Sequence, residues 1–269
     1  MEIAFTKLSP TQNVTVLVES PVPREAHAAI AARLLAVDGV GGEQAGFLEP
    51  PSLPGARMRL QMMGGEFCGN ATLSAAAVVM GQLGLDAGDM LIEVSGAPEP
   101  VRVTGAMSAP DRFDGEVGMP LPESIYECSF LDGFDCHTLP LVRFPGICHA
   151  IVSAGTLTRE KAEAVIGPWC RQIGSEALGL MFFDKDKNTL TPLVYVESTG
   201  TAVWEGSCAS GTAAVASYLA ELDGEYASVC LFEPRGRLSA EAACSGSQVT
   251  SLKLSGSAVI RGKNTVLLT

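Results

Sequence analysis

Two short segments, GGEFCGNATLSAAAV at residues 64–78 and EGSCASGTAAVASYL at residues 205–219, carry the strongest structural signal in the chain. In each, a turn rich in glycine or serine precedes a cysteine, and a run built largely of alanine, valine and leucine follows it. Cys68 and Cys208 lie 140 residues apart (208 minus 68), and at that offset a threonine also follows each cysteine by four positions. The match predicts an internal duplication with one thiol at the start of a helix in each half.

Each half is predicted to consist mostly of short strands, with one peripheral helix and one nearly all-apolar helix. A helix that is apolar on every side is a buried one. We therefore expect an α+β fold of two pseudo-symmetric halves, in each of which a curled, mostly antiparallel sheet surrounds a central buried helix. The expected halves are residues 1–122 with 256–269, which carry Cys68, and residues 123–255, which carry Cys208, with a cleft between them.

The residue patterns also place the individual elements. Helices are expected over residues 24–37, from Cys68 to about Leu83, from a Thr158 cap to about Ile173, and from Cys208 to about Leu222. Strands are expected around a turn at Ser9–Asn13 and near residues 46–49, 57–62, 90–94, 100–104, 113–118, 138–144, 148–153, 178–183, 190–197, 227–232, 236–242, 247–254 and 257–262.

Composition narrows the classes of partner. The formal net charge is −12, from 30 acidic and 18 basic residues without a Lys/Arg cluster, which disfavours nucleic acid. No run reaches the roughly 18 uninterrupted apolar residues of a membrane helix. The N-terminal sequence lacks the pattern of a signal peptide, so we expect a cytoplasmic protein. In that compartment the eight cysteines predict free thiols. Their spacing does not match a zinc site, so we expect no metal.

A thiol at a helix N-terminus faces unpaired backbone N–H groups and the positive end of the helix dipole. This environment favours the thiolate over the thiol. The same N–H groups bind anions. We therefore expect the backbone N–H groups of Gly69, Asn70, Ala209 and Ser210 to hold a substrate α-carboxylate. Glu205, the acid next to the second thiol, is expected to hold the α-ammonium group.

Two such thiols on opposite faces of one α-carbon can invert it. One thiolate removes the α-proton and the other thiol returns a proton from the opposite side, so no cofactor is needed. The lysines lie mostly in loops, and none stands in a setting typical of pyridoxal phosphate. Both cysteines could instead be structural, since Cys is often buried, but packing does not require Cys at both equivalent positions. Cys148 and His149 are adjacent, so on a strand they point to opposite faces and a Cys/His dyad is disfavoured.

At these motifs the chain resembles the diaminopimelate-epimerase superfamily of cofactor-independent, two-cysteine amino-acid racemases and epimerases. Cys68-Gly69-Asn70 and CASGT at residues 208–212 are similar to the two catalytic motifs of that family, and the resemblance covers most of the chain. It implies the family's fold, Cys68 and Cys208 as acid and base, and no cofactor. The other substrate-binding side chains that it implies are Asn13, Gln44, Gln61 and Glu205.

Departures from that family's pattern bear on the substrate. Ile147 and Gly179 stand where the family has amide side chains, and Gly206 replaces an arginine that would hold a distal carboxylate. Loss of a bidentate arginine removes the means of holding a second amino-acid end, which disfavours diaminopimelate. The shortened loop between Glu205 and Cys208 is similar to that of the histidine racemases of opine-metallophore biosynthesis.

We therefore predict a racemase that inverts the α-carbon of a small-molecule amino acid, histidine, without a cofactor. Three alternatives stay open: a diaminopimelate epimerase, a racemase of another amino acid, and a non-catalytic ligand-binding protein of the same fold. Neither nucleic acid nor a membrane is an expected partner. A homodimer is the assembly that we consider.

Overall fold

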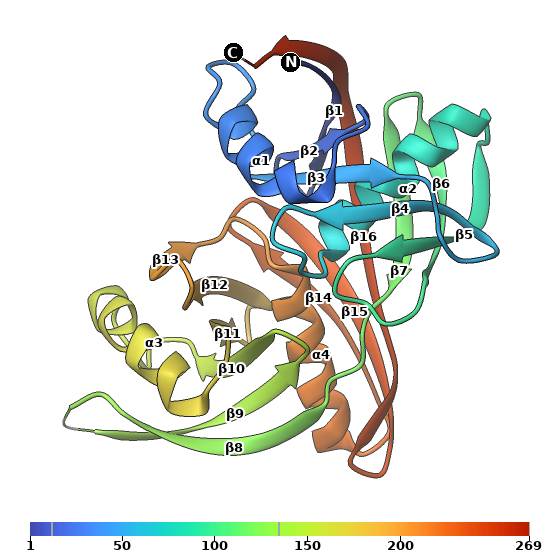
Figure 1. Ribbon diagram of the computed structural model, residues 1–269. Coiled ribbons are helices and arrows are strands. Elements are labelled where there is room, and N and C mark those ends of the chain that lie inside the picture. The colour runs from blue at the N-terminus through green and yellow to red at the C-terminus, as the bar shows by residue number, and fades with distance from the viewer. Residues whose placement is uncertain (12, 134, 269) are drawn as a thin grey trace. The chain divides into compact units, whose positions relative to one another are not determined.

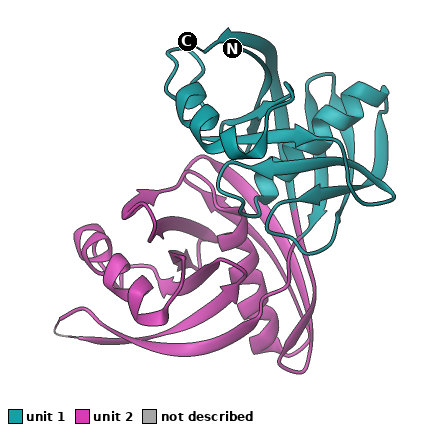
Figure 2. Ribbon diagram, in the orientation of Figure 1, with its two compact units in different colours: residues 1–118, 255–269 teal, residues 119–254 magenta. Residues whose placement is uncertain are grey.

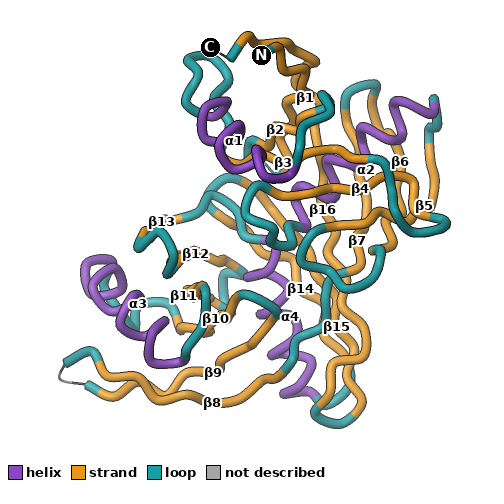
Figure 3. Tube along the Cα trace, viewed as in Figure 1, coloured by secondary structure: helices purple, strands orange, loops and turns teal. Residues whose placement is uncertain are grey.

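The computed structural model describes residues 1–11, 13–133 and 135–268, and its chain divides into two compact units (Figures 1 and 2). Unit 1 comprises Met1–Gly118 and Ser255–Thr269, and unit 2 comprises Met119–Leu254. Both units contain more strand than helix, so the predicted α+β class is confirmed (Figure 3). Within the described ranges, no helix has the length and apolar character needed to cross a membrane.

The sheet of unit 1 closes on itself. Its strands pair in the order β1-β2-β3-β4-β5-β6-β7-β16, and β16 pairs again with β1. The pairs β2–β3 and β4–β5 are parallel, and each is connected through a helix, as a parallel connection requires. The elements are β1 (Glu2–Pro10), β2 (Thr15–Val18), η1 (Arg24–Ala26), α1 (His27–Leu35), β3 (Gln44–Glu49), β4 (Ala56–Met62), α2 (Gly69–Leu83), β5 (Ala87–Val94), β6 (Val101–Ala109), β7 (Arg112–Gly118) and the C-terminal part of β16 (Gln248–Leu267).

Unit 2 repeats this order of elements. Its strands pair in the order β8-β9-β10-β11-β12-β14-β15-β16, with β13 beside β12. The parallel pairs β10–β11 and β12–β14 are again connected through helices. The elements are β8 (Ser124–Leu131), β9 (Cys136–Phe144), β10 (Ile147–Ser153), α3 (Arg159–Ile173), β11 (Ala177–Asp184), β12 (Thr189–Val196), β13 (Thr201–Trp204), α4 (Ala209–Asp223), β14 (Tyr226–Glu233), β15 (Gly236–Ser245) and the N-terminal part of β16.

Helices α2 and α4 are alike in length and in both ends. Each has 15 residues and an extended N-cap cysteine, with φ −136° and ψ 107° at Cys68 and φ −130° and ψ 103° at Cys208. Each ends at a left-handed glycine, Gly84 or Gly224, a conformation that costs glycine little. Residues 69–80 of α2 are all buried, since α2 contacts six strands of its own unit, β1, β2, β4, β5, β6 and β7. Helix α4 contacts β9, β10, β11, β14 and β15.

The predicted helices that start at the two cysteines and at Thr158 are confirmed to within one residue. Thr158 Oγ1 caps α3 by accepting the Lys161 N–H at 3.3 Å. The helix predicted over residues 24–37 is shorter than expected, because its first turn is the 3₁₀ helix η1 and α1 ends at Leu35. Neither N-terminus has a side-chain cap, and uncapped ends commonly tighten into 3₁₀ turns.

Some strand predictions were wrong. No strand was expected at β8 or β13, yet both form, paired with β9 and β12. Phe130 is the one fully buried residue of β8, so this strand lacks the apolar alternation that marks a half-buried strand. The two strands expected over 247–254 and 257–262 are one continuous strand, β16, and Gly256 lies inside it. The turn predicted at Ser9–Asn13 includes Gln12, which lies outside the described residues.

Burial of α2 makes its apolar side chains sensitive to truncation. Leu73→Ala should lower the free energy of unfolding by about 2–5 kcal/mol, because Leu73 is fully buried and the variant leaves a cavity. Leu83→Ala on the same helix is the control, since Leu83 is 51% exposed and its truncation should cost about 0.5 kcal/mol or less. Urea unfolding followed by circular dichroism measures both. Equal losses would contradict the burial of this helix.

Candidate active site

Cys68 lies at the N-terminus of α2 and is half-buried. Its Sγ accepts the Ala71 N–H at 3.4 Å and donates to Gln44 Oε1, also at 3.4 Å. Gln44 begins β3, and its Nε2 donates to the Thr15 hydroxyl of the parallel strand β2 at 2.7 Å. The structure therefore brings together two of the predicted site residues, Cys68 and Gln44.

Two further predicted residues of unit 1 carry buried polar atoms without partners. Asn70, the second residue of α2, is 2% exposed. Its Oδ1 and the Oδ1 of Asn13 are both buried and have no hydrogen-bond partner among the described residues. An unpaired buried acceptor costs roughly 1–3 kcal/mol. Both atoms are therefore suited to accept a hydrogen bond from a ligand.

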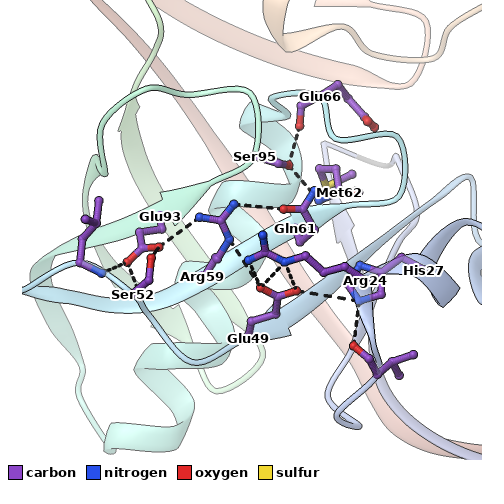
Figure 4. Close-up of polar contacts among 12 residues, drawn as sticks. Arg24, His27, Glu49, Ser52, Arg59, Gln61, Met62, Glu66, Glu93 and Ser95 are labelled. Carbon is purple, nitrogen blue, oxygen red and sulfur yellow. Dashed lines mark hydrogen bonds and ion pairs between the residues drawn. The ribbon is translucent and has the colours of Figure 1, made fainter.

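Gln61 belongs to a polar network on β3, β4 and β5 (Figure 4). Its Oε1 accepts from Arg59 Nη2 at 3.1 Å, and its Nε2 donates to the Met62 carbonyl at 3.4 Å. Arg59 also pairs with Glu93 at 3.2 Å and with Glu49 at 3.5 Å. Both ends of the Gln61 amide are thus engaged by this network, which restricts how the amide can turn toward a ligand.

Glu93 of β5 is the buried end of this network. Its carboxylate accepts the N–H of Ser52 at 2.7 Å, the hydroxyl of Ser52 at 2.8 Å and the N–H of Leu53. Burial by itself would raise the pKa of Glu93, but these hydrogen bonds, together with that from Arg59, lower it to about 2. Glu93 is therefore an ionised, fully bonded carboxylate at neutral pH.

The turn after β5 holds the loop that leads into Cys68. The Ser95 hydroxyl accepts the Met62 N–H at 2.9 Å and donates to the Glu66 carbonyl at 2.8 Å. Gly96 follows with φ +75°, and a Cβ at this position would lie 2.3 Å from the Phe67 backbone nitrogen. Only glycine tolerates both the positive φ and the close approach. The position of the first thiol thus depends on β5 as well as on α2.

Cys208 occupies the equivalent position on α4, but its surroundings differ. Its thiol is buried, makes no cap hydrogen bond to its own helix, and lies 3.6 Å from the Ser210 hydroxyl. Burial raises the pKa of the Cys208 thiol well above its usual range, and the carboxylates of Glu205 and Glu233 raise it further. The structure therefore brings together Cys208, Glu205 and Ser210, and the first residue of the helix is Ala209.

Glu233, the last residue of β14, was not among the predicted site residues. Its carboxylate accepts the Cys208 N–H at 2.5 Å and the Thr212 hydroxyl at a comparable distance, and the residue is 7% exposed. Burial raises the pKa of Glu233 to about 7, and the Thr212 and Cys208 donors oppose that shift. A sequence signal existed, because Glu93 and Glu233 are 140 residues apart (233 minus 93), the offset of the two cysteines.

The neighbours Cys148 and His149 on β10 point to opposite faces, as predicted. Cys148 belongs to the apolar core beneath α3, whereas a Cβ on Gly179 would lie 2.4 Å from His149 Nδ1. Both ring nitrogens of His149 are buried without a partner among the described residues. Burial lowers the pKa of His149 to about 3, so the imidazole is neutral at physiological pH.

The side chain of Arg235 lies beside Gly206 in the loop before α4. A Cβ on Gly206 would lie 2.4 Å from Cδ and 3.0 Å from Nε of Arg235, whose N–H donates to the Gly206 carbonyl at 2.9 Å. The sequence alone shows an arginine missing at position 206, but the fold places the side chain of Arg235 against that residue. Loss of arginine at 206 is therefore a weaker argument about the substrate than the sequence suggests.

The fold is similar to those of several solved structures. A phenazine biosynthesis protein of the PhzF family from Bacillus anthracis has a TM-score of 0.70 at 13% identity, with 100% of both chains covered. A probable proline racemase from Agrobacterium radiobacter K84 has a TM-score of 0.71 at 13% identity, covering 99% of this chain and 93% of that one. At this identity the likeness establishes the fold shared with these proteins.

The sequence comparisons establish the class and the family. A histidine racemase from Fusobacterium nucleatum is 32% identical over 230 residues, which is 80% of this chain and 80% of the relative. The chain is thus an isomerase of the amino-acid racemase class. The family described as "Histidine racemase CntK N-terminal domain" matches residues 2–266, and the chain belongs to this family. The predicted membership among the histidine racemases is confirmed.

The low pKa of Glu93 predicts a pH dependence of stability. A carboxyl whose pKa is depressed on folding stabilises the protein above its unfolded value, here near 4.5, and this stabilisation is lost as pH falls toward about 2. Glu93→Gln should therefore unfold at lower urea concentration than the parent at pH 7, with a gap that narrows from pH 5 to pH 3. Glu99→Gln, at an exposed position, is the control. A gap independent of pH would contradict the assignment.

Proposed function

We propose that this chain racemises free histidine at the α-carbon, with the thiols of Cys68 and Cys208 as its acid–base pair and without a cofactor. One observation carries the proposal. Each unit contains a 15-residue helix whose N-cap is a cysteine with nearly the same extended backbone conformation. Packing does not demand a thiol at both N-caps, whereas proton removal and proton return each need their own group.

The roles follow from the environment of each thiol. The N–H groups of Gly69 and Asn70 on α2, and of Ala209 and Ser210 on α4, belong to first turns whose donors lack partners within the helix. Such donors bind a carboxylate and stabilise the enolate-like charge that develops when the α-proton leaves. One thiolate then removes the proton while the other thiol supplies one from the opposite face.

The remaining polar groups suit the rest of an amino acid. Glu205, which interacts with the Cys208 thiol, is our candidate partner for the α-ammonium. The unpaired Oδ1 atoms of Asn13 and Asn70, and Gln44 beside Cys68, are candidates to accept N–H donors of the ligand. Both the ammonium group and an imidazole ring provide such donors.

Histidine as the substrate rests on the family and on the relative from Fusobacterium nucleatum, which is named a histidine racemase. A neutral imidazole carries few polar atoms, so it needs fewer partners than a second zwitterionic amino-acid end. Diaminopimelate remains the alternative, because Arg235 lies beside Gly206 and could hold a distal carboxylate. We further propose that each buried helix, α2 and α4, is the centre of its sheet, as in diaminopimelate epimerases.

The two-thiol mechanism predicts that both cysteines are necessary. Cys68→Ser and Cys208→Ser should each lower the turnover number for histidine racemisation by about 10²–10⁴-fold, the usual contribution of a general acid or base. Cys230→Ser is the matched control, because Cys230 is an exposed thiol on β14 and its loss should leave turnover unchanged. Circular dichroism of L-histidine solutions follows the reaction. Parental turnover in either site variant would exclude a two-thiol mechanism.

The substrate is tested without assumptions by hydrogen exchange. Each L-amino acid, and L,L-diaminopimelate, is incubated with the protein in D₂O, and loss of the α-proton signal is followed by NMR. Histidine should exchange fastest, and diaminopimelate should exchange little. Faster exchange of diaminopimelate would establish the alternative and assign Arg235 to its distal carboxylate. If another monocarboxylic amino acid exchanges faster than histidine, the two-thiol mechanism would stand and that amino acid would be the substrate instead of histidine.

A further inference from the structure

We propose that Glu233 is a positioning residue that fixes the N-terminal turn of α4 and holds the Cys208 thiol protonated, so that Cys208 is the acid of the resting enzyme. The inference rests on the proposed function for the catalytic role of Cys208. The contact between Glu233 and the turn does not depend on that role.

Glu233 binds the turn at two points. The carboxylate accepts the N–H of Cys208 at 2.5 Å and the hydroxyl of Thr212, which also donates to the Cys208 carbonyl at 3.0 Å. In an ordinary capping box the third helical residue supplies the carboxylate that binds the N-cap N–H. Here a neighbouring strand supplies it, so β14 rather than α4 itself determines where Cys208 lies.

The same carboxylate acts on the thiol through its charge. Burial is the largest cause of the raised Cys208 pKa, and a negative charge next to a thiol also disfavours the thiolate, so that Glu205 and then Glu233 raise this pKa further. The sulfur of Cys208 does not cap α4, and its contact with the Ser210 hydroxyl at 3.6 Å, which lowers the pKa of the thiol, is outweighed by burial and by the two carboxylates. The positive end of the helix is thus opposed by carboxylates at this cysteine.

Other ionisable groups border this turn in the described part of unit 2. Arg235 lies against Gly206 in the loop before α4. His149 on β10 is neutral and is separated from this turn by Met181. The Sδ of Met181 would lie 2.2 Å from a Cβ on Gly211, and its Cε would lie 2.6 Å from a Cβ on Gly179. The strand β15, which also packs on α4, buries apolar residues there, Leu238, Ala240 and Ala242.

In unit 1 the equivalent glutamate, Glu93, has different partners, and its charge is balanced by an arginine. At the equivalent position Glu93 binds Ser52, Leu53 and the guanidinium of Arg59, and its charge is compensated there. The sulfur of Cys68 accepts the Ala71 N–H of its own helix, a contact that favours a thiolate, and it donates to Gln44 Oε1, a contact that the thiol makes only while it is protonated. The reaction then balances as Cys68–S⁻ taking the α-proton while Cys208–SH gives its proton to the α-carbon and becomes the thiolate.

Ionisation of the thiol can be measured directly. In protein labelled with [3-¹³C]cysteine, the Cβ shift of each cysteine follows its own titration, and Cys208→Ser assigns the signal. In the parent, Cys208 should titrate at higher pH than the exposed Cys230. In Glu233→Gln, which keeps an acceptor for the Cys208 N–H, the Cys208 midpoint should fall by at least half a pH unit, about threefold more thiolate at a given pH.

Glu93→Gln is the matched control and should leave the Cys208 midpoint unchanged. A parental midpoint of Cys208 at or below that of Cys230 would overturn the proposal, and that measurement needs no variant to fold. An unchanged midpoint in folded Glu233→Gln would also overturn it. None of these titrations requires turnover, so a failure to racemise histidine would refute the proposed function and leave this result standing.

Discussion

A buried helix N-terminus is the constraint on which the rest of this structure depends. The first turn of a helix carries backbone N–H groups that no residue of the helix can accept, and burial makes unpaired donors costly. Most residues of α2 and α4 are buried, and both helices pack against the strands of their own units, so few of these donors can be left to bulk water. Something within each unit, or a bound anion, has to satisfy those donors. At α2 the Cys68 sulfur accepts the Ala71 N–H, and at α4 Glu233 accepts the Cys208 N–H.

The two units satisfy this constraint with the same architecture and different chemistry. In both units the strand that follows the buried helix carries a glutamate at the same offset from the cysteine. These residues are Glu93 on β5 and Glu233 on β14. Glu93 is bonded to Arg59 and to a loop, which frees the first turn of α2. Glu233 is bonded to the first turn of α4 itself. A duplicated fold has therefore kept its backbone while the two ends have acquired different electrostatic surroundings.

The parts that could be predicted from the sequence are those with a local signal. A cysteine after a turn, an apolar run and a terminal glycine define α2 and α4, and Thr158 marks α3. Strand β8 could not be found in this way, because Phe130 is its one fully buried residue, and the continuity of β16 is decided by partners on two units. At the site, the cysteines and Gln44 follow from motifs. The side chain of Arg235 beside Gly206 depends on the turn after β14, which no motif specifies.

Unequal surroundings have a consequence for a proton-transfer enzyme of the proposed kind. Inversion at carbon needs one thiolate and one thiol at the same moment, and two thiols in identical environments would spend part of the time both protonated or both ionised. At Cys208, burial and the carboxylates of Glu205 and Glu233 raise the pKa of the thiol, whereas the sulfur of Cys68 accepts one N–H of its helix and donates to the Gln44 amide. A pair of thiols whose pKa values differ has one dominant singly ionised form between those values. Near-symmetry of the backbone supplies two equivalent positions, and in the mechanism we propose the different surroundings of Glu93 and Glu233 determine which cysteine holds the proton.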